Sequence, residues 1–171
     1  MAQNVKDTNF VIGALYYLNS FLFALVLTCI IYLLKAYLGK VGSLIFSGYL
    51  AFFAQGLTNY AKSLYWSGWT FIFPLFMMLL AVKYLQKLKW QLRYAGYFLA
   101  SFIGVLPRFL CSYEYSPSIL ISILVPIIFV CFKEKSRPLD GIISLASTAV
   151  GGASAFALSF AFYISKLQGV F

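Results

Sequence analysis

Six apolar runs divide this chain, and each is close to the length that crosses the hydrocarbon core of a bilayer. A membrane-spanning helix needs roughly 20 apolar residues. Because lipid offers no hydrogen bonds to the backbone, such runs are expected to be helical. The sequence therefore predicts an all-α, polytopic membrane protein, a compact bundle of about six transmembrane helices with short loops. The expected spans are 10–34, 41–61, 64–82, 94–112, 118–132 and 141–165.

The expected helices end for local reasons. The stretch 35–40, with Gly39 between two lysines, ends the first span, and the basic run 83–93 ends the third. Pro117 and Pro138 stand just before the fifth and sixth spans, where a missing backbone N–H costs least. These breaks set the order of spans and loops along the chain.

Composition predicts one membrane domain over residues 1–171. The chain is 63% hydrophobic and only 10% charged, and no segment outside the apolar runs reaches the ~40 residues that a small soluble domain needs. All function is therefore expected in the spans and short loops. The fifth run, 118–132, contains Pro126 and is short for a span, so it is expected either to extend back over 113–116 or to be bent or half-inserted.

The positive charges predict the orientation. If all six runs span the membrane, the loops 35–40, 83–93 and 133–140 share one side and carry most of the lysine and arginine residues. Cytoplasmic loops are enriched in these residues. We therefore expect these three loops to be cytoplasmic and both termini to be outside, in a cell (inner) membrane.

The basic run 83–93 predicts contact with anionic lipid headgroups. Its cations flank leucines at helical spacing, as in helices that lie on a membrane surface, and a near-surface cation contributes about 1 kcal/mol. The alternative is that the run only orients the neighbouring spans. Because the cations are spread over several loops, nucleic acid is not an expected partner. The expected headgroup-binding residues are Lys83, Lys87, Lys89 and Arg93.

Small side chains occupy every odd-numbered position from Ser147 to Ala161 in the last span. On a helix they form two stripes on roughly opposite sides, because two residues turn about 200°. Such stripes let helix backbones approach closely in lipid, so this helix is expected between two neighbours; the alternative is that Ala and Gly are simply common in membrane spans. The expected packing residues are Ser147, Gly151, Ala155 and Ser159 on one stripe, with Ala153 and Ala157 on the other.

A polar set is expected in the outer half of the bundle. Gln55, Asn59 and Lys62 fall within about a 100° arc of the second span, and Arg108 approaches the outer end of the fourth. Arg108 is expected either to extend to the headgroups near Glu114, or to receive an anionic ligand or a carboxylate of another subunit. The expected ligand- or partner-binding residues are Asn19, Gln55, Asn59, Lys62, Arg108 and Glu114.

The chemistry-bearing residues argue against an enzyme. The chain has no histidine and four carboxylates, and none of the carboxylates lies in the middle of a span, so acid–base and metal chemistry lack their usual groups. No catalytic residue, metal or cofactor is expected. The prediction is a non-enzymatic structural or accessory subunit of a larger membrane assembly, associating with other membrane subunits or with itself. The alternative is a small transporter, channel or substrate-capture protein with an outward-facing polar pocket for a small molecule.

Overall fold

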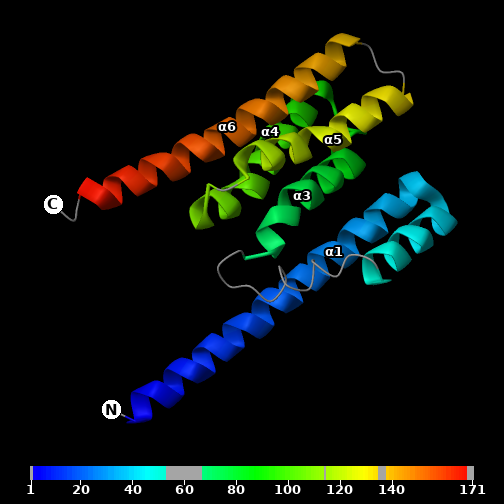
Figure 1. Ribbon diagram of the computed structural model, residues 1–171. Coiled ribbons are helices and arrows are strands. Elements are labelled where there is room, and N and C mark those ends of the chain that lie inside the picture. Colours follow the sequence, from blue (N-terminus) through cyan, green and yellow to red (C-terminus); the bar gives the residue numbers. More distant parts are fainter. Residues whose placement is uncertain (1, 53–66, 114, 135–137, 169–171) are drawn as a thin grey trace. The chain divides into compact units, whose positions relative to one another are not determined.

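The computed structural model describes residues 2–52, 67–113, 115–134 and 138–168, and all regular structure in these residues is α-helical (Figure 1). Four of the helices contain segments long and apolar enough to cross a membrane, and α3 is shorter. These findings support an all-α integral membrane protein. The helices are α1 (Ala2–Phe52), α3 (Trp69–Leu85), α4 (Trp90–Cys111), α5 (Ser116–Glu134) and α6 (Pro138–Gln168).

The described residues hold five helices, so the six expected spans are matched only in part. The second expected span, 41–61, begins within α1, and its last residues, 53–61, lie outside the described part of the chain. α5 begins at Ser116, before the apolar run 118–132, in agreement with the alternative in which the fifth span extends back toward 113–116. Pro117 at the start of this helix has no backbone N–H to leave unsatisfied there.

Contacts divide the chain into two compact units, Met1–Ile72 and Phe73–Phe171. In the first unit, α1 contains a sharp kink at Gly39, with φ 72° and ψ 178°. Glycine adopts a positive φ without steric cost because it has no Cβ. The break expected between residues 35 and 40 therefore falls at Gly39, and Figure 1 shows the chain changing direction there.

In the second unit, α6 packs against both α4 and α5, and its contact with α4 is the more extensive. The chain returns along α5 between these two helices, so α4 and α6 run parallel, side by side in Figure 1. Their interior holds both apolar and polar side chains, and Ser101, Arg108 and Thr148 are among the buried polar ones. Its fully buried side chains include Val105, Phe109, Ile123, Ile127 and Ala155.

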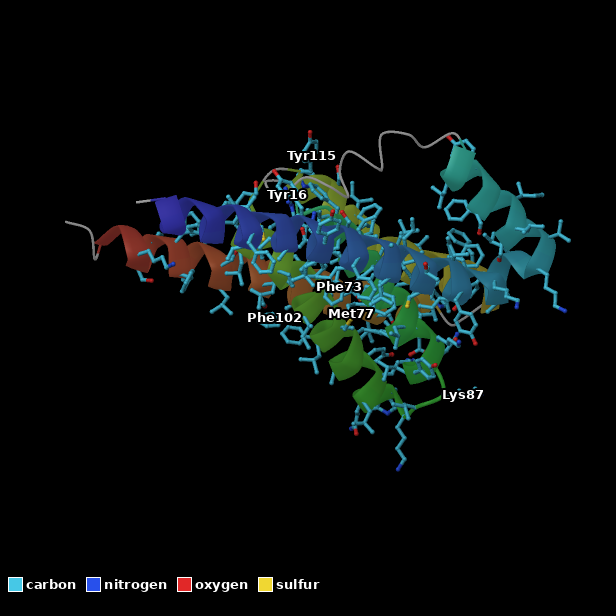
Figure 2. The ribbon with its side chains drawn as sticks, turned by 90° about the horizontal axis from the view of Figure 1, so that it is seen from below. Tyr16, Phe73, Met77, Lys87, Phe102 and Tyr115 are labelled. Carbon is cyan, nitrogen blue, oxygen red and sulfur yellow. The ribbon has the colours of Figure 1, made fainter. Side chains whose placement is uncertain are left out.

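The antiparallel helices α3 and α4 approach each other closely at Gly104. A Cβ at this position would lie 3.1 Å from the Pro74 Cα and 3.2 Å from the Met77 Cβ; Figure 2 shows Met77 on α3. Gly104 therefore lets the backbones of α3 and α4 approach each other more closely than a larger side chain would allow. This fixes α4 between α3 and α6.

The orientation predicted from the basic loops is testable at two exposed positions of the second unit. Lys87 lies at the turn between α3 and α4, and Tyr115 precedes α5 at the other end of α4 (Figure 2). In a background without the native cysteines, Lys87→Cys is expected to resist an impermeant maleimide in intact cells and to react after permeabilisation. Tyr115→Cys is expected to react in intact cells. Labelling of position 87 from outside would contradict the orientation.

Candidate functional site

The contact between α4 and α6 is a direct approach of two helix backbones. A Cβ added to Gly151 would overlap the Phe98 carbonyl oxygen and the Ser101 Oγ. Only a residue without a side chain fits this point, because a carbonyl group of the opposite helix cannot rotate away as a side chain can. Gly151 therefore sets the distance between α4 and α6.

Hydrogen bonds join the two helices along this contact. Ser147 Oγ donates to the Tyr94 carbonyl at 2.6 Å. Ser101 Oγ lies 2.9 Å from the Thr148 carbonyl and donates to it. In a bilayer each such bond contributes about 0.6 to 2 kcal/mol. Because these donors and acceptors succeed one another in the same direction on both helices, they hold α4 and α6 in one parallel register.

A cluster of aromatic rings lies in the same interface near the C-terminal end of α4. Phe109 and Phe156 meet edge to face with centroids 5.3 Å apart, and Tyr113 lies 5.5 Å from Phe156. Tyr163 OH donates to the Leu110 carbonyl at 2.7 Å. That carbonyl belongs to the last turn of α4, where carbonyls lack intrahelical partners. These tyrosines thus do more than form an interfacial belt, since one of them caps α4.

The two predicted small-residue stripes have different surroundings. Gly151, Ala155 and Ser159 are buried and Ser147 is half-buried, on the side of α6 that meets α4. The other stripe is exposed to the surroundings along its whole length; its members are Ala149, Ala153, Ala157 and Ala161.

The second neighbour of α6 within this unit is α5, and it is reached through a different face. A Cβ at Gly152 would lie 2.8 Å from Ile123 Cδ1, and one at Gly141 would lie 3.1 Å from Cys131 Sγ. α6 therefore does lie between two helices, but neither α4 nor α5 covers Ala153 and Ala157. The exposed stripe has no partner among the helices of residues 73–168.

The predicted polar set in the outer half is only partly visible. Arg108 is fully buried within the protein, at 0% exposed. This burial favours contact with protein groups over extension to the headgroups, and both interpretations stay predictions. Asn19 is also buried, at 5% exposed, on the face of α1 that carries buried Phe23 and Val26. Outside the described residues lie Gln55, Asn59, Lys62 and Glu114. The outward-facing pocket remains a prediction.

A second polar cluster lies at the opposite end of α4 and α6, which is the predicted cytoplasmic end. Arg93 Nη2 and Asp140 Oδ1 form an ion pair at 3.6 Å. Tyr94 OH donates to the same carboxylate oxygen at 2.5 Å. Arg93 and Asp140 line a cavity of about 50 Å³ together with Gln86 and Ser144.

The four predicted headgroup cations differ in exposure. Lys87 and Lys89 are exposed, and Lys83 is half-buried with its Nζ 5.4 Å from the centroid of the Tyr84 ring. Arg93 is half-buried and also joins α4 to Asp140 of α6. Headgroup contact by these residues stays a prediction. Sequence reasoning missed Asp140, because its partner lies 47 positions earlier in the chain and no local pattern links them.

The second unit therefore offers two features that could bind another molecule. One is the exposed alanine stripe of α6, and the other is the polar cavity beside Arg93 and Asp140. The first can bring another helix backbone close, and the second can hold a polar group. Comparison with known protein families, with curated proteins and with solved structures finds no match for this chain.

Proposed function

We propose that this chain is a non-enzymatic subunit of a larger membrane assembly, and that the exposed alanine stripe of α6 contacts a transmembrane helix of a different subunit. This proposal rests on the different surroundings of the two small-residue stripes of α6. One small-residue stripe lies against α4, whereas Ala149, Ala153 and Ala157 are exposed.

The side chains of this stripe suit a helix contact better than a lipid contact. Lipid tails accept leucine or phenylalanine as readily as alanine, whereas close packing of two membrane helices favours small side chains. Ala149, Ala153 and Ala157 follow one another at i,i+4 spacing and are all exposed, so the side chains at these positions of α6 are small. A second helix backbone can approach along this stripe.

The partner is proposed to be a different protein because of what this chain lacks. The sequence has no histidine, and its few carboxylates include Asp140, which is paired with Arg93. Assembly with copies of itself would add no chemical group. A subunit that supplies a helix and a defined surface, while another subunit supplies the chemistry, is consistent with this composition.

The test is a comparison of assembly for variants of the two exposed surfaces. The double variant Ala153→Leu/Ala157→Leu is expected to lose a stoichiometric membrane partner during purification from native membranes, because each leucine overpacks a close contact at a cost of about 1 to 3 kcal/mol. Its own unfolding midpoint in detergent is expected to stay within error of wild type, since both side chains are exposed in the isolated unit.

Ala95→Leu is the matched control, because Ala95 is an exposed alanine on α4. It is expected to keep both the partner and the unfolding midpoint. Purified wild-type assemblies should be measured by light scattering, which gives their mass. A wild-type protein that is monomeric, or an assembly containing only copies of this chain, would overturn the proposal, and so would full retention of the partner by the double leucine variant.

A further inference from the structure

The cavity beside Arg93 and Asp140 has unmet hydrogen-bonding capacity. Its volume is about 50 Å³, and since one water needs roughly 10 to 15 Å³, it has room for a group of several atoms. Gln86 Nε2 and Arg93 Nε are buried and have no acceptor among the described residues. Buried N–H donors are rarely left without an acceptor, so the cavity is suited to a ligand that brings acceptor oxygens.

The charges around the cavity favour an anionic acceptor. The carboxylate of Asp140 already receives Tyr94 OH at 2.5 Å and faces Arg93 Nη2 at 3.6 Å. The Nε of Arg93 takes no part in this pair and has no acceptor among the described residues. Lys87 and Lys89 are exposed in the adjoining turn. Arginine binds phosphate oxygens through strong, charge-assisted hydrogen bonds.

An apolar groove adjoins the polar cavity. It has a volume of about 360 Å³ and lies between α5 and α6, where its walls include Ile128, Phe132, Ile142 and Leu145. Cys131 and Gly141 line both the groove and the cavity, so the two spaces are neighbours. A ligand that fills both has a polar, phosphate-bearing head and a hydrocarbon tail.

We propose that this site binds one anionic membrane phospholipid. Its phosphodiester accepts hydrogen bonds from Gln86 Nε2 and Arg93 Nε, and one of its acyl chains lies in the groove between α5 and α6. The site belongs to the end of the helices that carries the basic loops 83–93 and 133–140, which is where headgroups of the predicted cytoplasmic leaflet are found. The proposal is independent of the proposed assembly.

The experiment measures binding of added phosphatidylglycerol to the delipidated full-length protein by native mass spectrometry. Wild type is expected to retain one molecule. Gln86→Leu removes one donor to the phosphate, and Leu145→Trp fills the groove; each is expected to weaken binding about tenfold or more, the effect of losing one hydrogen bond to a charged group or a well-fitted chain. Gln86→Leu removes an unmatched donor, so the lipid-free protein is expected to unfold at an unchanged or higher temperature.

Two matched controls make the same chemical changes outside the site. Gln91 and Leu92 are exposed on the first turn of α4, and Gln91→Leu and Leu92→Trp are expected to bind phosphatidylglycerol as wild type does. Phosphatidylcholine with identical chains is expected to bind more weakly, and inorganic phosphate more weakly still. Equal affinity for Gln86→Leu and Gln91→Leu would overturn the proposal. Phosphate binding as tight as that of the lipid, or no preference for the anionic headgroup, would overturn it as well.

Discussion

Gly151→Ala is expected to lower the free energy of unfolding of the second unit by about 2 to 3 kcal/mol, although it adds a single methyl group. The new Cβ would overlap the Phe98 carbonyl oxygen, which belongs to the backbone of α4. To relieve this overlap α6 has to separate from α4. Separation weakens the hydrogen bond from Ser147 Oγ to the Tyr94 carbonyl, now 2.6 Å long, at the same time.

The neighbouring glycine provides the control for this prediction. Gly152→Ala brings the same methyl group and the same gain in helix propensity of about 1 kcal/mol. Its Cβ meets only the ends of two flexible side chains, Ile123 and Leu120. We expect its unfolding free energy to change by less than about 1 kcal/mol. Titration of the purified proteins with a denaturing detergent measures both values, and equal effects at the two positions would show that α6 does not rest on the backbone of α4.

The sequence predicted close packing on the face of α6 that meets α4, and the neighbour expected on the second stripe stays a prediction. The spacing of Ser147, Gly151 and Ala155 identifies a face suited to close packing, because helical periodicity is a local property of the chain. Which helix occupies that face is not local, and the same spacing on Ala153 and Ala157 led to the expectation of a second neighbour there. In residues 73–168 the second neighbour, α5, meets Gly152 instead.

Helix ends were predictable for a similar reason. Gly39 interrupts α1 because glycine can adopt a backbone conformation that other residues avoid. α6 begins at Pro138 because proline has no backbone N–H and is tolerated in the first turn of a helix. The apolar run 118–132 is shorter than α5, which also includes Ser116 and Lys133, so the run alone left open whether the helix extends back. A search for apolar runs does not detect polar residues at the end of a helix.

The pairing of charged residues was the least predictable part of the candidate sites. Arg93 stands in a run of cations, and its neighbours suggest a lipid-facing role. Its ion pair with Asp140 depends on α4 and α6 lying parallel in one register. That register follows from the packing of Gly151 against Phe98 and not from any feature of residues 83–93. A charged residue near a span end therefore needs the tertiary structure before its partner can be named.

Arg108→Lys is expected to destabilise the protein by about 2 kcal/mol or more, even though the positive charge is kept. Arg108 is 0% exposed, so an ammonium group placed there is cut off from water. The compact, strongly hydrated lysine head also loses more solvation on burial than arginine does. Detergent titration measures the loss.

Lys166→Arg is the control, because Lys166 is exposed on α6 with its Nζ 4.8 Å from the centroid of the Phe162 ring. There either cation reaches water, and we expect a change within about 0.5 kcal/mol.

Arg108→Met separates the effect of charge from the effect of side-chain volume. A buried apolar side chain of similar length is often tolerated when no charged partner is left behind. If Met is tolerated and Lys is not, Arg108 fills space at a cost in solvation. If both fail, the guanidinium holds a partner, and it becomes the first residue to test for loss of assembly. Full stability of Arg108→Lys would contradict the burial and favour the interpretation in which this side chain extends to the headgroups.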